Sequence, residues 1–174
     1  MKLLINDLYS RQVQAVGIEN LDREKYSIVD SKGSKNHYCI GCFGCWLKTP
    51  GRCFIRDDFQ TMGERLASSD EILIISKATF GGFSSAVKNV MDRSISFVSP
   101  FFDIRGGEMH HRERYPKHLT ISAVFYGHMT EEEKETARGF VKANALNLNG
   151  QMGTVTFLDD IESPGSLKEL KEVL

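Results

Sequence analysis

Residues 71–76 read Glu-Ile-Leu-Ile-Ile-Ser, and this stretch decides the fold. Its uninterrupted aliphatic run, Ile72–Ile75, is typical of a strand that is buried on both faces, as the strands of parallel sheets are. The loop Lys77–Phe83 contains two glycines and is followed by apolar residues at helical spacing, with Ser84 or Ser85 as the helix cap. Strand, short loop and helix in this order predict one βα unit of a parallel sheet.

The same alternation of strand and helix patterns recurs along the chain. Four further segments are predicted to be strands: Lys2–Asn6, Tyr26–Val29, His118–Tyr126 and Gly153–Leu158. The prediction is therefore a single α/β domain over residues 1–174, a three-layer sandwich around a five-stranded parallel sheet in the flavodoxin-like order 2-1-3-4-5. In such sheets ligands bind at the carboxyl ends of the strands, and the loop Lys77–Phe83 is a candidate ligand site there.

Two acidic or hydroxyl motifs are interpreted as helix caps. Asp57 and Asp58 precede a short apolar helical pattern, and we expect them to cap that helix without any chemical role. Thr130, followed three residues later by Glu133, matches the capping box and predicts the start of a long helix.

Composition narrows the class of protein. The chain is 41% hydrophobic and 26% charged, with a formal net charge of −1, so no overall basic field favours nucleic acid or anionic lipid as a partner. The apolar runs are too short for a signal peptide or a membrane span. The expected location is the cytoplasm, where thiols stay reduced.

All four cysteines lie in one segment, which we call the cysteine loop (residues 39–56). Cys39, Cys42, Cys45 and Cys53 have the spacing C-x2-C-x2-C-x7-C. Short C-x-x-C steps let thiolates converge on one point, as an iron–sulfur cluster requires. Zinc sites usually consist of two separated C-x-x-C pairs, which makes zinc the less favoured metal. Small, inert, buried cysteines are a third interpretation that the spacing leaves open.

A second unusual segment is residues 99–117, for which we expect a long irregular loop. Long loops in compact domains are usually functional or interfacial, and a subunit contact is the preferred role here. The adjacent residues His110 and His111 are not expected to chelate one metal ion together.

The segment from Cys39 to Arg93 resembles the flavodoxin-like NAD(P)H-dependent FMN reductases, in particular their iron–sulfur flavoprotein branch. The resemblance is carried by the cysteine loop together with Phe80–Ser85 and Lys88–Arg93. Residues 107–111, with Arg114 and Tyr115, are similar to the long loop of the same family.

This resemblance implies a flavin-dependent oxidoreductase or electron-transfer flavoprotein with FMN at the strand ends, and a homodimer or homotetramer. It implies NAD(P)H as a donor, a small-molecule or protein acceptor, and a [4Fe–4S] cluster on the four cysteines. No catalytic acid or base is assigned. The residues implied to contact FMN are Ser10, Arg11, Ser76, Ala78, Thr79, Phe80, Gly81, Gly82, Phe83, Tyr126, Gly127 and His128.

The turn after the first strand departs from the pattern of that family. Family members place a turn rich in glycine, serine and arginine here, and its N–H groups bind the FMN phosphate. Residues 6–11 contain no glycine and introduce Asp7, whose charge repels a phosphate dianion, and Lys77 stands where relatives often carry proline. A second hypothesis is therefore a flavodoxin-like scaffold or partner subunit that has lost FMN and is not an enzyme.

Overall fold

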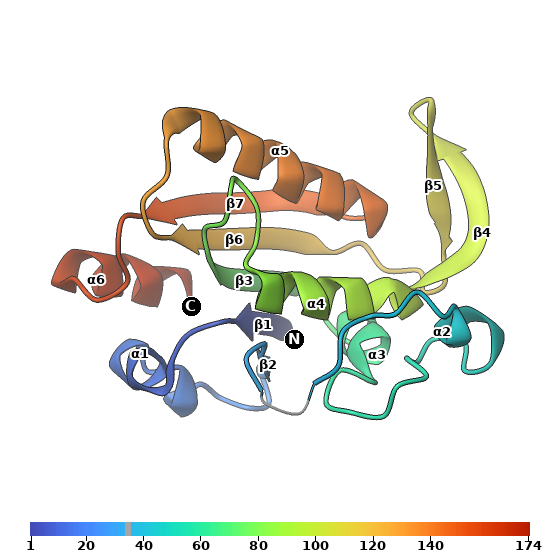
Figure 1. Cartoon of the computed structure of the whole chain (residues 1–174), viewed down its shortest axis with the longest axis horizontal. Coiled ribbons are helices and arrows are strands. Elements are labelled where there is room, and N and C mark those ends of the chain that lie inside the picture. Colours follow the sequence, from blue (N-terminus) through green and yellow to red (C-terminus); the bar gives the residue numbers. More distant parts are fainter. Residues whose placement is uncertain (34–35) are drawn as a thin grey trace.

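The computed structural model describes residues 1–33 and 36–174, and its centre is a parallel sheet (Figure 1). The order of the strands in this five-stranded sheet is β2-β1-β3-β6-β7, and every neighbouring pair is parallel. The strands are β1 (Lys2–Asn6), β2 (Tyr26–Asp30), β3 (Glu71–Lys77), β6 (Thr120–Tyr126) and β7 (Gln151–Leu158). The five segments predicted to be strands thus form one sheet.

Helices cover both faces of the sheet, as Figure 1 shows. One face packs against α3 (Met62–Ala67), α4 (Ser85–Arg93) and α5 (Glu131–Asn147). The other face packs against α1 (Ser10–Val16) and α6 (Pro164–Val173). The α/β sandwich with a parallel sheet is therefore confirmed.

Strand β3 is buried on both faces. Ile72 and Ile74 belong to the apolar cluster under α3, α4 and α5, whereas Leu73 and Ile75 belong to the cluster under α1 and α6. All four side chains are at most 2% exposed. A strand whose alternate side chains enter two different cores needs no polar face, which is why the sequence shows an unbroken aliphatic run.

The predicted order 2-1-3-4-5 needs correction to 2-1-3-6-7, because the chain forms two more strands after β3 and before β6 in the sequence. Residues expected to form an irregular loop instead form an antiparallel pair, β4 (Val98–Arg105) and β5 (Glu108–Glu113). The pair is a separate two-stranded sheet, which projects beside the end of α5 (Figure 1).

The turn of this hairpin had a readable signal. Arg105 pairs with Glu108 across a two-residue connection, and both Gly106 and Gly107 have positive φ, +59° and +87°. Two-residue hairpin turns of this type require positive φ at both positions, and Gly-Gly is among the sequences that supply it. The register shifts between Val98 and Phe102, where proline at position 100 cannot donate to the ladder.

Three predicted helix caps can be compared with the structure. The Ser84 hydroxyl accepts from the Val87 amide at 3.3 Å, so the predicted cap of α4 is confirmed. The Thr130 hydroxyl accepts from the Glu133 amide at 3.2 Å, and the Glu133 carboxylate accepts from the Thr130 amide at 3.0 Å, so the capping box is confirmed. The prediction for Asp57 and Asp58 is wrong, because α3 begins at Met62 after Thr61. In the part of the chain that the structure describes, none of the helices has the length and apolar character needed to cross a bilayer.

Candidate functional site

The cysteine loop lies beside α4 and includes the short helix α2 (Gly44–Leu47). Cys39 and Cys42 are exposed, whereas Cys45 and Cys53 are only 9% and 8% exposed. Burial raises the pKa of the Cys45 thiol above its usual value, and neighbouring thiolates, Cys53 foremost, act in the same direction. Two exposed thiols and two buried thiols therefore share one loop.

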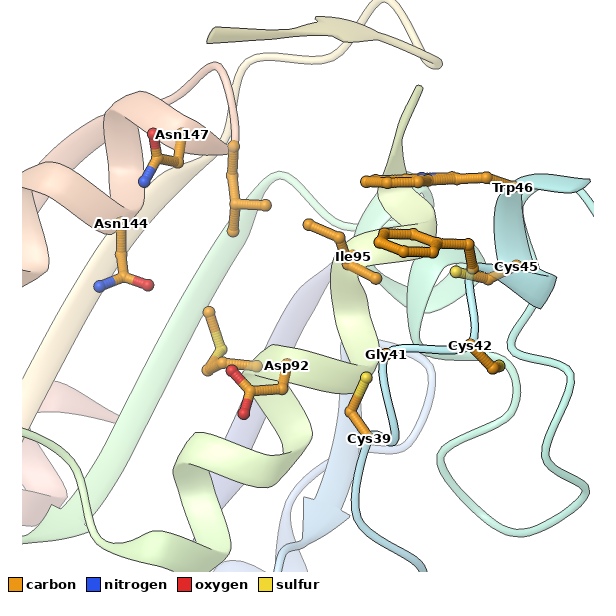
Figure 2. Close-up of a pocket in the computed structure, with 12 residues that line it drawn as sticks. Cys39, Gly41, Cys42, Cys45, Trp46, Asp92, Ile95, Asn144 and Asn147 are labelled. Atoms are coloured by element: carbon orange, nitrogen blue, oxygen red, sulfur yellow. The ribbon is translucent and has the colours of Figure 1, made fainter. Parts of the chain in front are cut away.

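A cavity of about 510 Å³ opens between this loop, α4 and the end of α5 (Figure 2). Cys39, Cys42 and Cys45 line one wall. The rest of the lining is largely apolar and includes Phe43, Trp46, Met91, Ile95 and Leu148. Asp92 of α4, with Asn144 and Asn147 of α5, adds polar side chains. Such a cavity suits a compact, weakly polar group held by thiolates better than a highly charged ligand.

Aromatic rings fix the outer part of the loop to the hairpin. The rings of Phe43 and Trp46 stack at 5.5 Å between centroids, and Trp46 also contacts the His111 ring of β5 at 4.9 Å. The Trp46 indole N–H donates to the Val98 carbonyl at 3.0 Å. His111 therefore supports the loop by packing.

The side chain of Arg93, at the end of α4, is fully buried and holds both ends of the cysteine loop. Its guanidinium donates to both carboxylate oxygens of Asp57, at 2.6 and 2.8 Å. It also donates to the carbonyls of His37 and Ile55, at 2.7 and 3.2 Å, and to the Cys53 Sγ at 3.1 Å. One side chain thus joins the residues before the first cysteine to those after the last.

One turn earlier on α4, Asn89 makes a second clamp. Its side-chain carbonyl accepts from the Cys39 amide at 3.3 Å, and its amide group donates to the His37 carbonyl at 3.2 Å. Residues four apart lie on the same face of a helix, so Asn89 and Arg93 present one binding surface to the loop. The position of the cysteines is therefore set by α4.

Asp57 has its charge stabilised by these contacts. Burial by itself would raise the pKa of this carboxyl, but hydrogen bonds and charge from Arg93, together with the His37 and Phe59 amides, outweigh it and lower the pKa to about 2. Asp57 is thus half of a buried ion pair, with a 3% exposed side chain, and is not a helix cap.

Acid should weaken the protein through this pair. A carboxyl whose folded pKa lies below its ordinary value stabilises the fold above that ordinary value, and the contribution is lost as the pH falls toward 2. We expect the difference in unfolding free energy between the wild type and Asp57→Asn to shrink by about 2 kcal/mol between pH 7 and pH 2.5. Urea titrations at both pH values measure it. A difference that stays constant would contradict the assigned role.

The donor set of the cysteine loop fits an iron–sulfur cluster in chemistry. Four thiols lie within one loop, three of them line one cavity, and the fourth, Cys53, accepts from Arg93. Hydrogen bonds to cluster sulfurs are a usual feature of such sites. Among residues 1–33 and 36–174, however, no three Cys, His, Asp or Glu side chains converge as they would on a metal ion. The four thiols are therefore not gathered at one point in this structure.

The residues expected to contact a flavin lie at the carboxyl edge of the sheet and at the start of α1. Thr79, Phe80 and His128 are exposed, and Phe80 is 91% exposed in a tight turn in which Thr79 and Gly82 exchange backbone hydrogen bonds. Gly127, with φ +102°, continues this edge. The exposed ring of Phe80 is therefore available to stack on a flat aromatic ligand.

Four of the expected contact residues are buried. Ser76 accepts from the Ser84 amide at 2.9 Å, so it holds the start of α4. Gly81 packs against α5, where a Cβ would lie 2.8 Å from Thr136. The ring of Phe83, which the resemblance implied to contact FMN, is 6% exposed and packs in the core. The fourth, Tyr126, donates its hydroxyl to Asp7 at 2.9 Å.

The β1–α1 turn does not fit a phosphate group. The Leu8 amide donates to the Asn6 side chain at 3.2 Å, and the Tyr9 amide donates to the Gln12 side chain at 2.9 Å, so neither is free for an anion. Arg11 pairs with Glu162 at 2.6 Å. Ser10 is exposed at the first position of α1, without the glycine turn that a phosphate site uses.

Asp7 occupies the centre of this edge and was not among the expected site residues. Its side chain is fully buried, and its two oxygens accept from the Lys77 amide at 3.2 and 3.0 Å. Burial raises the pKa of Tyr126, and the Asp7 charge adds to that effect, so the phenol stays protonated as a donor. Asp7 therefore joins the ends of β1, β3 and β6.

Known proteins resemble this chain in sequence over about half of its length. No protein-family model matches the chain. An iron–sulfur flavoprotein of Methanocaldococcus jannaschii is 33% identical over 87 residues, and one of Archaeoglobus fulgidus is 34% identical over 89 residues. These matches cover 50% and 51% of this chain but only 42% of each relative, so the chain matches less than half the length of these relatives.

Solved structures extend the likeness over the whole chain. An NAD(P)H:quinone oxidoreductase from Methanothermobacter marburgensis has a TM-score of 0.61 at 15% identity, covering 99% of this chain and 92% of its own. An FMN-dependent NADH-azoreductase from Bacillus anthracis has a TM-score of 0.57 at 13% identity, covering 99% and 96%. Such identities establish the fold alone. The chain is therefore a flavodoxin-like α/β protein that, over half of its length, is similar in sequence to the iron–sulfur flavoproteins.

Proposed function

We propose that this protein is a flavin-dependent oxidoreductase or electron-transfer flavoprotein that carries a thiolate-bound iron–sulfur cluster. The observation that carries the proposal is sequence similarity to two iron–sulfur flavoproteins over half of the chain. Solved flavin-dependent reductases with the same fold support it. NAD(P)H is the proposed donor, and a reducing compartment, the cytoplasm, keeps the four thiols available.

The proposal assigns the two groups to different parts of the molecule. The shelf formed by Thr79–Gly82 and Gly127–His128 would hold the isoalloxazine ring, which supplies the hydride or electron chemistry. Cys39, Cys42, Cys45 and Cys53 would hold the cluster, which exchanges single electrons. The protein's own contribution is to bind the ring at a glycine-edged surface, to exclude water at the inner thiols and to orient Cys53 through Arg93.

Residues 99–117 contain most of the projecting β4–β5 hairpin (Figure 1), on which Phe101 and Ile104 are exposed. We propose this segment as a contact between subunits.

The first test is an absorbance spectrum of protein purified without oxygen, with iron and sulfide assays on the same sample. Flavin bands that survive desalting and matched iron and sulfide would support the proposal. Cys45→Ser should lose the iron, because the inner thiol cannot be replaced by a hydroxyl at a thiolate site. A protein without colour, even after anaerobic reconstitution, would refute it.

A matched pair of phenylalanine variants tests the flavin shelf. Phe80→Ala should weaken flavin binding by about 2- to 10-fold, the usual worth of one aromatic contact. Phe101→Ala removes another exposed ring, 68% exposed, from the hairpin and should leave flavin binding unchanged. Fluorescence titration measures both. Equal effects of the two variants would place the flavin elsewhere.

A second candidate function is a scaffold or partner subunit without flavin. The closed β1–α1 turn favours it, since Asp7 and Glu162 place two carboxylates where an anion would bind. A protein that folds normally, holds iron on its cysteines and binds no flavin would select this function.

A further inference from the structure

The β1–α1 turn contains its own anions, and this bears on which flavin the protein selects. Asp7 lies within the turn with its carboxylate fully buried, and it accepts hydrogen bonds from the Lys77 amide and the Tyr126 hydroxyl. A buried carboxylate with these donors is a fixed part of the structure, because breaking the contacts would leave the charge unpaired. A phosphate at the turn would therefore meet a negative charge that cannot move away.

A second carboxylate faces the start of α1. Glu162, which precedes α6, accepts from the Arg11 guanidinium at 2.6 Å and from the Gln12 side chain at 3.2 Å. Arg11 is one of the residues that the resemblance implied to contact FMN, and its charge is already paired. The Gln12 side chain also accepts from the Tyr9 amide at 2.9 Å, so this N–H group is not free for an anion.

Lys77 completes the arrangement. Its backbone amide donates to both oxygens of Asp7, and a proline at this position would have no N–H to donate. The Asp7 carboxylate and the backbone amide of Lys77 are thus the two partners of one contact. The contact links residues 70 apart and closes the edge of the sheet beneath the proposed flavin shelf.

We infer that the flavin is recognised without its 5′-phosphate, so that riboflavin binds this protein as well as FMN does. The inference rests on the proposed function, since it names the ligand class of the same site. The ring would be held by the Thr79–Gly82 and Gly127–His128 shelf, and the phosphate of FMN would gain nothing at the turn.

The test is a pair of fluorescence titrations of the whole protein, one with FMN and one with riboflavin. The two dissociation constants should agree within about threefold, whereas a phosphate held by free helix N–H groups would favour FMN by more than tenfold. An FMN preference of that size would overturn the inference while leaving the proposed function intact. Absence of binding for both flavins would refute the proposed function and this inference with it.

Two variants sharpen the result. Asp7→Asn keeps the shape of the side chain but removes the buried charge, and Glu162→Gln, on the surface, frees Arg11 without touching the core. Each should shift the preference toward FMN by about threefold to tenfold, because a repulsion is removed or a cation released. Glu71→Gln, an exposed carboxylate that pairs with Lys2 at the opposite end of the sheet, is the control for net charge and should not change the preference. A preference that no charge-removing variant alters would count against the assignment of Asp7 and Glu162.

Discussion

Arg93→Met should lower the free energy of unfolding by about 3–5 kcal/mol, the cost of removing one partner of a buried ion pair. The guanidinium is fully buried and donates to both Asp57 oxygens, to two backbone carbonyls and to the Cys53 sulfur. Methionine fills a similar volume but leaves the Asp57 carboxylate buried without a counter-charge. Urea unfolding followed by the fluorescence of Trp46, the single tryptophan, measures the loss.

Two further variants separate this ion pair from general effects of removing a charge. Lys88→Met breaks the exposed pair with Asp92 on the same helix, at 2.6 Å, and should cost no more than about 0.5 kcal/mol. Adding Asp57→Asn to Arg93→Met removes the stranded charge, so the double variant should be more stable than the sum of the two single losses indicates. Additive losses would show that the two side chains do not act as a pair.

The second large effect is expected at Phe83. Its ring stacks on Phe125 at 5.3 Å and meets Phe140 edge-on at 5.0 Å, so it joins the loop after β3 to β6 and α5. Phe83→Ala should lower the free energy of unfolding by about 3–5 kcal/mol, because it removes buried apolar surface and leaves a cavity. Thermal and urea unfolding both report this change.

Phe80, three residues earlier in the same loop, is the matched control. Its ring is 91% exposed, and Phe80→Ala should change the unfolding free energy by no more than about 0.5 kcal/mol. Phe80→Ala is therefore expected to weaken flavin binding without lowering stability, whereas Phe83→Ala is expected to lower the free energy of unfolding. Equal losses of stability at both positions would mean that the loop is packed differently.

The sequence by itself determined the elements whose physical causes are local. The aliphatic run Ile72–Ile75 identified a strand buried on both faces, and Thr130 with Glu133 identified a helix start, because period and capping depend on residues a few positions apart. The spacing of the cysteines determined that four thiols share one loop. The Gly-Gly pair at 106–107 is an equally local signal of a two-residue hairpin turn.

Tertiary structure decided the roles of the charged and aromatic side chains. Asp57 pairs with Arg93 from 36 residues away, and Asp7 meets Tyr126 from 119 residues away. Neither partner is visible from spacing, so Asp57 resembled a helix cap and Asp7 resembled only a defective phosphate turn. Phe80 and Phe83 lie in one loop, yet only the packing of β6 and α5 determines which ring is buried. Burial and charge pairing depend on which segments the fold brings together, and this is the physical reason that these roles emerge only in three dimensions.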